Sequence, residues 1–369
     1  METSSNVPVA DKECPPVSFS SHADNDLYIV LLKENTPTTT SIQAATSVRD
    51  RSTRVLLRHN IASKRMHTVL YNMHSGFIAN LSSSEANELI ADHEVEIVEQ
   101  DRVLSLNTGC FTIVSPGTAQ WGVNRVGAGD GSGKRVWVVD TGIDMDHPDL
   151  NVNQELSQSF VSNQTSPNDQ NGHGTHVAGI IAALNNNFGV LGVASGVDLV
   201  ALKVLNNEGE GNTSNIIKAL NYIAQHAKPG DVVNMSLGAD TISNSLDYAV
   251  KSLAEKGILF SLAAGNNRKD AAHTSPARVN HPNVFTVSAI DSVGRFAGFS
   301  NFGKDVVDFA APGVHIVSTY IDGKYARLSG TSMAAPHVAG LLVLKGRNIR
   351  SNGFALNDPD GVPDPIASY

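Results

Sequence analysis

The stretch "RVWVVDTGIDMDHPDL" (residues 135–150) places an acidic residue directly after a short apolar run. Four consecutive apolar residues precede Asp140. Continuous runs of this kind are typical of strands that are buried on both faces of a parallel sheet. Asp140 then stands at the carboxyl end of the strand, where an ionised carboxylate needs a hydrogen-bond donor. Two roles are open for it: a turn or capping residue, which is the commoner case, or a carboxylate that orients a histidine.

The same pattern recurs along the chain. Four more apolar runs follow: "VDLVALKVL" (197–205), "DVVNMSLG" (231–238), "GILFSLAAGN" (257–266) and "NVFTVSAI" (283–290). Helical patterns lie between them: "GTHVAGIIAAL" (174–184), "TSNIIKALNYIAQHAKPG" (213–230) and "SNSLDYAVKSLAEKG" (243–257). This alternation predicts an α/β fold with a doubly wound, mostly parallel sheet and helices on both faces. Ligands of such sheets bind at the carboxyl ends of the strands, so polar residues there are candidates for function.

Composition excludes several classes of protein. A hydrophobic content of 41% over 369 residues is enough for a large core. The formal net charge of −9, without a basic cluster, argues against nucleic acid as a partner. No run approaches the roughly 18 apolar residues of a membrane span. The two cysteines, Cys14 and Cys110, cannot build a disulfide framework and lack the spacing of a zinc site.

The chain divides into four parts. Residues 1–26 are polar, have no apolar run of signal-peptide length, and are predicted to be disordered. Residues 27–107 predict a small α+β unit, in which Ser82 and Glu85 form a capping box before a helix. Residues 108–120 are turn-rich and predict a linker. Residues 121–369 hold the α/β pattern and end in a polar, turn-rich tail.

A histidine pair lies in "NGHGTHVAGI" (171–180). The helical zinc-protease motif needs histidines at i and i+4 with a glutamate between them, whereas His173 and His176 are three apart, so a metal is disfavoured here. His173 stands beside two glycines at the start of the helix, which suits a general base. His176 lies inside the helix and is expected to be a packed, hydrogen-bonded residue.

Two further polar groups follow strands or begin helices. Asn266 ends the run "SLAAGN", where it is either an ordinary turn residue or a side-chain N–H donor to a developing oxyanion. In "LSGTSMAAPH" (328–337), Thr331 and Ser332 straddle a helix start, where free backbone N–H groups are available. A serine hydroxyl becomes a nucleophile only when a base takes its proton.

In these motifs the chain resembles the subtilase family of serine proteases. "VVDTGID", "HGTHVAG" and "GTSMAAPHVAG" occur in the Asp, His, Ser order that subtilisin has. The resemblance implies that Asp140 orients His173, that His173 is the general base, and that Ser332 is the nucleophile. It also implies an oxyanion hole formed by Asn266 and the backbone N–H of Ser332.

The resemblance also implies where a substrate and a metal bind. Substrate-binding positions fall on Gly209, Gly211, Ser236, Leu237, Gly238, Ala263, Ala264 and Gly265. The matching segments carry no charge at the pocket walls, so an apolar or aromatic residue before the scissile bond is expected. "ALNNNFGVLGVA" (183–194) is similar to a structural calcium loop, with ligands from Asp149, Leu184, Asn186, Phe188 and Val190. A turn without metal is the alternative.

Residues 27–107 resemble the family's inhibitory propeptide, a small ferredoxin-like domain. The resemblance implies a zymogen that cleaves itself near Asn107. It also implies protein and peptide substrates, a monomer, and an extracellular location although no signal peptide is visible. A catalytically impaired, peptide-binding pseudoprotease is the alternative from another class. An esterase of the α/β-hydrolase type is disfavoured because Ser332 comes last and lacks the G-x-S-x-G elbow.

Overall fold

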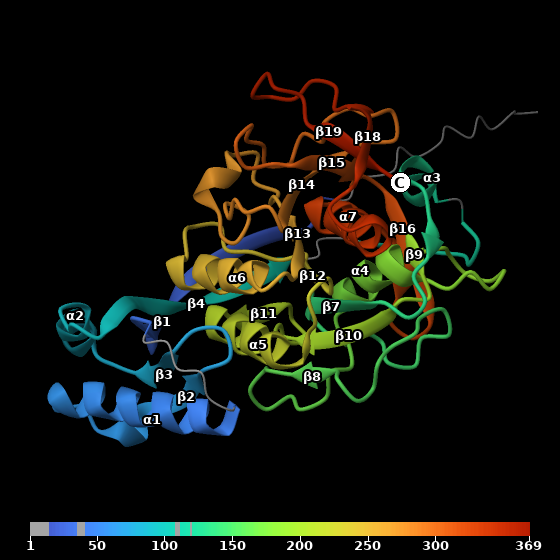
Figure 1. Ribbon diagram of the computed structural model, residues 1–369. Helices are drawn as coiled ribbons and strands as arrows, with labels where there is room; N and C mark the ends of the chain where they lie inside the picture. Colours follow the sequence, from blue (N-terminus) through green and yellow to red (C-terminus); the bar gives the residue numbers. More distant parts are fainter. Residues whose placement is uncertain (1–14, 35–40, 108–110, 119) are drawn as a thin grey trace, which may run out of the picture.

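A nine-stranded sheet forms the centre of the C-terminal unit (Figure 1). The computed structural model describes residues 15–34, 41–107, 111–118 and 120–369. The strand order is β18-β19-β15-β14-β13-β12-β7-β10-β8, and every neighbouring pair is parallel except β18 with β19. The strands are β7 (Arg135–Asp140), β8 (Gln158–Ser159), β10 (Asp198–Lys203), β12 (Val232–Met235), β13 (Leu259–Ala263), β14 (Val284–Ile290), β15 (Phe309–Pro312), β18 (Arg350–Phe354) and β19 (Pro365–Ser368). The mostly parallel sheet predicted from the apolar runs is confirmed.

Helices cover both faces of this sheet. Helices α4 (His173–Ala182) and α7 (Thr331–Lys345) pack together on one face, and α5 (Thr213–His226) and α6 (Asn244–Glu255) pack together on the other (Figure 1). Every residue of α4 is buried, the polar His173, Thr175 and His176 included. Smaller elements complete the unit: α3 (Trp121–Val126), β5 (Thr112–Val114), β6 (Gly129–Asp130), β9 (Ala194–Ser195), the 3₁₀ helix Ala271–His273, β16 (Ile316–Tyr320) and β17 (Lys324–Leu328).

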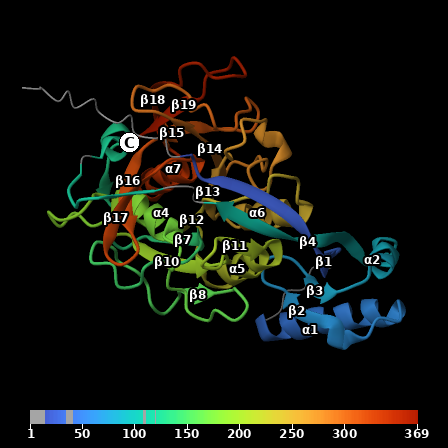
Figure 2. The same cartoon turned by 180° about the vertical axis from the view of Figure 1, so that it is seen from behind.

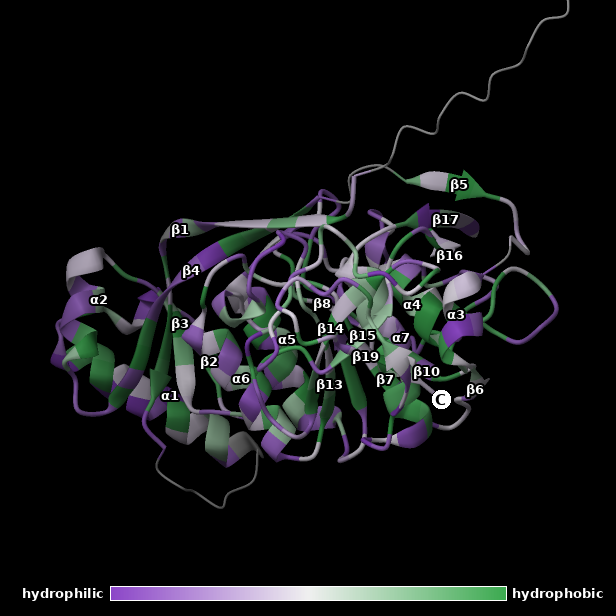
Figure 3. Ribbon diagram, turned by 90° about the horizontal axis from the view of Figure 1, so that it is seen from above, coloured by the Kyte–Doolittle hydropathy of each residue, from purple (hydrophilic) through white to green (hydrophobic). Residues whose placement is uncertain are grey.

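The N-terminal unit is a small α+β domain whose sheet extends onto the larger unit (Figure 3). Its elements are β1 (Ser18–Leu32), α1 (Ser41–Arg58), the 3₁₀ helix Ser63–Arg65, β2 (Met66–Leu70), β3 (Gly76–Asn80), α2 (Ser83–Ile90) and β4 (Val95–Asn107). The predicted capping box is confirmed, because the Ser82 side chain accepts from the Glu85 backbone N–H and the Glu85 side chain accepts in return. Strand β11 (Glu210–Asn212) of the larger unit adds to this sheet beside β4.

Three segments have more structure than their composition predicts. The disorder expected for residues 1–26 is wrong from Ser18 onward, because β1 pairs with β4 there and buries Val17 and Phe19. Residues 1–14 of that segment, Cys14 among them, lie outside the described residues, and so does Cys110. The predicted linker contains β5, which pairs with β17. The polar C-terminal tail forms β18 and β19, and β19 extends the central sheet.

Candidate active site

The strand order places a topological switch point between β7 and β12. From β7 the chain passes to β10 on one side of β7, and later to β12 on the other side. Asp140 is the last residue of β7, and Ser236 directly follows β12. Because β7 and β12 are parallel, these two residues lie at the same edge of the sheet. This is the position where ligands bind in doubly wound folds.

Asp140 and His173 form a fully buried pair. Their side chains are 0% exposed, and His173 Nδ1 lies 2.8 Å from Asp140 Oδ1. Because a carboxylate only accepts hydrogen bonds, Nδ1 carries the proton, and Nε2 keeps a lone pair. Nε2 has no hydrogen-bond partner among the described residues. The pair therefore has the orientation that a general base requires.

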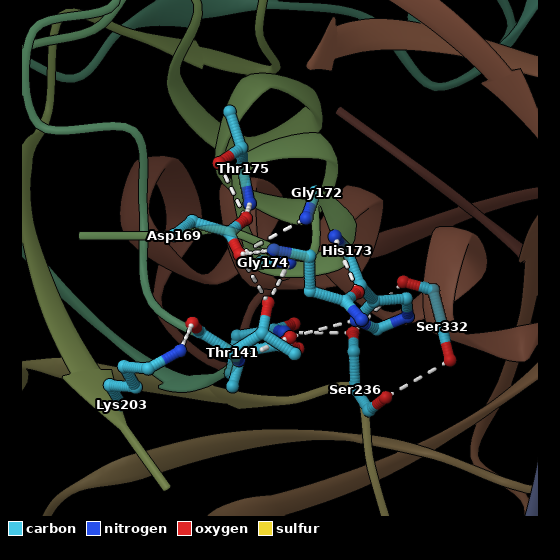
Figure 4. A network of polar contacts seen from close by, with 12 residues as sticks. Thr141, Asp169, Gly172, His173, Gly174, Thr175, Lys203, Ser236 and Ser332 are labelled. Atoms are coloured by element: carbon cyan, nitrogen blue, oxygen red, sulfur yellow. Dashed lines mark hydrogen bonds and ion pairs between the residues drawn. The ribbon is translucent and has the colours of Figure 1, made fainter. Parts of the chain in front are cut away.

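A buried carboxylate, Asp169, connects the two segments that carry this pair (Figure 4). Its Oδ1 accepts from the Thr141 hydroxyl at 2.9 Å and from the Gly172 N–H at 3.0 Å. Its Oδ2 accepts from the Thr175 N–H at 3.0 Å and hydroxyl at 2.6 Å. Thr141 in turn accepts from the Gly174 N–H at 2.9 Å. Gly172 and Gly174, on either side of His173, are thus connected to Thr141, which follows Asp140.

Asp169 and Lys203 were not predicted from the sequence. Burial raises the pKa of Asp169 above its usual range, against hydrogen bonds that lower it. Lys203 is 1% exposed and donates from Nζ to the Thr141 carbonyl at 2.7 Å, and burial lowers its pKa. The sequence held a signal for both residues, since each is a charged residue at an unusual place. Asp169 lies four residues before His173, and Lys203 interrupts an apolar strand.

Ser332 and Ser236 exchange two hydrogen bonds (Figure 4). The Ser332 hydroxyl donates to the Ser236 carbonyl at 3.0 Å, and the Ser236 hydroxyl donates to the Ser332 carbonyl at 2.9 Å. The second bond has a local cause. In a helix the Ser332 carbonyl accepts from the N–H of residue 336, but Pro336 has none. Ser236 supplies the missing donor and holds the first turn of α7 at the strand edge.

Asn266 is oriented by Thr331, at the start of α7. Its side-chain oxygen accepts from the Thr331 N–H at 2.8 Å and from the Thr331 hydroxyl at 2.9 Å. These two bonds direct the amide nitrogen Nδ2 away from Thr331. Asn266 is 8% exposed, and Nδ2 has no hydrogen-bond partner among the described residues. An amide donor held in this way suits an oxyanion.

The other polar side chains of residues 328–337 have structural contacts. The Ser329 hydroxyl accepts from the His315 N–H at 2.9 Å. His337 Nδ1 lies 2.8 Å from the Met333 carbonyl in the preceding turn of α7. His337 is fully buried, and burial lowers its pKa to about 4, so this ring is neutral at ordinary pH.

Four of the predicted substrate-binding residues line one small cavity at the ends of β12 and β13. They are Gly238, Ala263, Ala264 and Gly265. Ser236 and Leu237 are buried but do not line it. The cavity also has one carboxylate, Asp240, which lies just outside the segments that predict an uncharged pocket.

Gly209 and Gly211, two of the predicted substrate-binding residues, form a strand edge that we call the substrate edge. This edge pairs with the N-terminal unit. Gly211 lies opposite Leu104 of β4, and the Gly209 carbonyl accepts from the Leu106 N–H at 2.8 Å. A Cβ on Gly209 would lie 2.4 Å from the Leu106 carbonyl oxygen, and its φ of +83° also favours glycine. Strand β4 therefore lies against this edge as an added β-strand.

The segment predicted to bind calcium surrounds a buried carboxylate. Asp149 is 0% exposed and accepts from the Asn186 side chain, the Val190 N–H and the Tyr325 hydroxyl, at 2.9–3.2 Å. Burial raises its pKa. No cationic side chain pairs with Asp149 in the described part of the chain. Gln120 exchanges hydrogen bonds with the backbone of Leu191, in the same segment. A fully buried carboxylate that meets only neutral donors fits a hard cation. Asn186 faces it with Nδ2, because the Asn186 side-chain oxygen accepts from the Phe188 N–H at 2.9 Å.

The comparisons with known proteins identify two families. Residues 131–348 match the subtilase family, and residues 27–107 match the peptidase inhibitor I9 family. The chain is 39% identical to alkaline serine exoprotease A of Vibrio alginolyticus over 294 residues, which cover 76% of this chain and 53% of that protein. It is 35% identical to proteinase R of Parengyodontium album over 344 residues, which cover 89% of this chain and 81% of that protein. It is 45% identical to subtilisin Savinase of Lederbergia lenta over 231 residues, 61% of this chain and 82% of that protein.

A solved structure has the same fold. The crystal structure of a cold adapted subtilisin-like serine proteinase matches with a TM-score of 0.60 and 37% identity, covering 67% of this chain and 97% of that one. The chain belongs to the subtilase family and carries an I9 propeptide domain. Its enzyme class is serine-type endopeptidase. The pseudoprotease alternative has no support among these relatives. Within the described ranges, none of the helices is long and apolar enough to cross a membrane.

Proposed function

We propose that Ser332, His173 and Asp140 form the catalytic triad of a zymogen that cleaves itself and then hydrolyses protein and peptide substrates. The buried Asp140–His173 pair is the observation that carries this proposal, because it leaves His173 Nε2 with a lone pair and no partner. The Ser332 hydroxyl donates to the Ser236 carbonyl here, so a rotation of its side chain must bring that proton to Nε2 before attack.

The chemistry that follows is acyl transfer. Ser332 Oγ forms a bond to the peptide carbonyl carbon as its proton passes to His173 Nε2. The carbonyl oxygen becomes an oxyanion, which accepts from Asn266 Nδ2 and the Ser332 N–H. The C–N bond breaks and the amine leaves with the proton from His173. A water molecule then attacks the acyl-enzyme carbonyl while His173 takes its proton. The ester bond to Ser332 breaks, and His173 returns a proton to Ser332 Oγ.

The substrate preference and the processing site follow from the two surfaces described above. Glycines and alanines make up half of the pocket lining, which supports apolar or aromatic residues before the scissile bond. The lining also has polar and acidic side chains, from Asn267, Thr274, Ser275, Asn301 and Asp240. Strand β4 lies on the substrate edge and ends at Asn107, which supports self-cleavage near that residue. Pairing through the backbone gives affinity with little sequence selection.

The test is a pair of variants of the full chain. Ser332→Ala is expected to abolish self-cleavage and the hydrolysis of a chromogenic peptide. Asn266→Ala is expected to lower kcat by about 10²–10³ with little change in KM, the loss known in subtilisin for an oxyanion donor. Hydrolysis by Ser332→Ala at the parent rate would show that the triad is assigned wrongly.

Calcium is proposed as a structural ion held by Asp149, the Asn186 side chain and the carbonyls of Leu184, Phe188 and Val190. It would neutralise the buried carboxylate and fix residues 183–194 on the body of the enzyme. We also propose an extracellular monomer that has no nucleic-acid or membrane partner. The net charge of −9 supports the absence of nucleic acid, and the alkaline protease relatives support the location.

A further inference from the structure

The first half of β1 lies outside the matched inhibitor domain, which begins at residue 27. Residues 18–23 pair antiparallel with residues 102–107 of β4, from Ser18 opposite Asn107 to Ala23 opposite Arg102. Figure 2 shows β1 running beside β4 from the N-terminal unit onto the C-terminal unit. Burial alternates along this half, since Val17 and Phe19 are buried while Ser18 and Ser20 are exposed. The strand therefore presents one apolar face to the larger unit.

Phe19 occupies the pocket that substrate side chains would enter. Its ring is 8% exposed and lines the same cavity as Gly238, Ala264 and Gly265. Only about 20 Å³ of that cavity remains open to a water-sized sphere. This is room for about one water molecule, so a second aromatic side chain cannot enter while Phe19 is present.

Three hydrogen bonds fix the segment to the catalytic unit. The Val17 N–H donates to the Ser329 carbonyl at 2.9 Å, three residues before the proposed nucleophile. The Ser21 hydroxyl donates to Asp240 at 2.5 Å, at the pocket. The Asn212 side chain of β11 donates to Asp24 at 2.9 Å. The segment is thus held at its two ends and in the middle.

The direction of this strand explains why it is not itself a substrate. Strand β4 is antiparallel to β11, which is the orientation proposed for a substrate. Residues 18–23 are antiparallel to β4 and so run the opposite way through the site. Their carbonyl and N–H groups are reversed relative to a substrate's, so Phe19 fills the pocket without presenting its peptide bond as a substrate does.

We propose that residues 17–24 are a second inhibitory strand, in which Phe19 blocks the primary specificity pocket from outside the I9 domain. This inference rests on the proposed function of the site. For self-cleavage near Asn107, Phe19 must first leave the pocket, because the residue before the scissile bond has to occupy it. Phe19 therefore slows self-cleavage, and it then helps to retain the cleaved fragment of which it is part.

The first experiment follows activation of the full chain. Parent, Phe19→Ala and Ser20→Ala chains are refolded, and self-cleavage is followed by mass spectrometry while a peptide p-nitroanilide with Phe before the scissile bond reports free active sites. Phe19→Ala should cleave itself and release activity about 10- to 100-fold faster, the range expected when a buried aromatic anchor is removed. Ser20→Ala is the matched control, since this exposed side chain is on the same strand, and it should follow the parent. Equal rates for Phe19→Ala and the parent would overturn the proposal.

A second experiment does not depend on activity. In chains that also carry Ser332→Ala, hydrogen exchange is measured at residues 18–23 and 103–107. Phe19→Ala should speed exchange there at least tenfold relative to Ser20→Ala, while β7 and β12 keep their protection and report a folded catalytic unit. Unchanged exchange at residues 18–23 would refute the anchoring role of Phe19. Absence of catalysis in every chain of the first experiment, the parent included, would instead refute the proposed function, and the exchange result would still decide whether Phe19 is an anchor. If Phe19→Ala loses protection everywhere, Phe19→Leu, which keeps an apolar side chain, replaces it, and the same criteria apply.

Discussion

Replacing Ser236 should destabilise the protein in a way that depends on a proline one hundred residues later in the chain. The Ser236 hydroxyl donates to the fully buried Ser332 carbonyl, which has lost its helical donor to Pro336. Ser236→Ala leaves that carbonyl without a partner. A buried acceptor left unsatisfied costs about 1–3 kcal/mol, which we expect as the decrease in the free energy of unfolding.

The second variant, Pro336→Ala, makes this reasoning testable. It restores an N–H at position 336, so the Ser332 carbonyl regains an intrahelical donor. The cost of Ser236→Ala should then fall by the share that is due to the unsatisfied carbonyl, and the remainder comes from the buried Asn234 side chain, which donates to the Ser236 hydroxyl at 2.9 Å. The assay is urea unfolding of the full chain, with Ser332→Ala in every variant to prevent self-cleavage, analysed as a double-mutant cycle.

Ser261 provides the matched control. Its hydroxyl also donates to a carbonyl of α7, that of Ala335, at 2.8 Å. That carbonyl keeps its helical donor, the N–H of Ala339, because residue 339 is not a proline. Ser261→Ala should therefore cost less than Ser236→Ala, and the same amount with and without Pro336→Ala. An unchanged cost of Ser236→Ala in the Pro336→Ala background would refute this role of the Ser236 hydroxyl.

Two further predictions concern pH and metal. Burial, aided by neighbouring carboxylates, raises the pKa of Asp364 from 3.8 to about 7. Between these two pH values the folded state therefore binds one more proton than the unfolded state. The stability that this proton contributes is fully present below about pH 4 and is lost as pH rises through about 7. Asp364→Asn cannot ionise, so its melting temperature should exceed the parent's at pH 8.5 by more than at pH 5, and an equal difference at both pH values would contradict the assignment. Calcium at one hundred times its Kd should stabilise the parent by about 2.7 kcal/mol in calorimetry, and EDTA should abolish this stabilisation. Asp149→Asn should respond to neither calcium nor EDTA. A parent whose stability is the same with calcium and with EDTA would contradict the proposed calcium site.

Much of the fold and the candidate site could be predicted from local sequence. The apolar runs predicted the parallel sheet, because strands buried on both faces need uninterrupted apolar residues. Asp140, His173, Asn266 and Ser332 were found because each follows a strand or begins a helix within a recognisable motif. The low apolar content of residues 1–26 was misleading, because two buried side chains and a partner strand are enough to order a short segment.

The sequence by itself determined which groups can do chemistry and that strand ends bring them to one edge. Only the tertiary structure decided how those groups are held. Asp169 and Lys203 bond across the site to residues from other segments, and Ser236 replaces a helical donor that Pro336 lacks. The position of Phe19 in the pocket was likewise decided by packing between distant segments. Local periodicity reports which face of an element is apolar, whereas these contacts depend on which distant element that face meets.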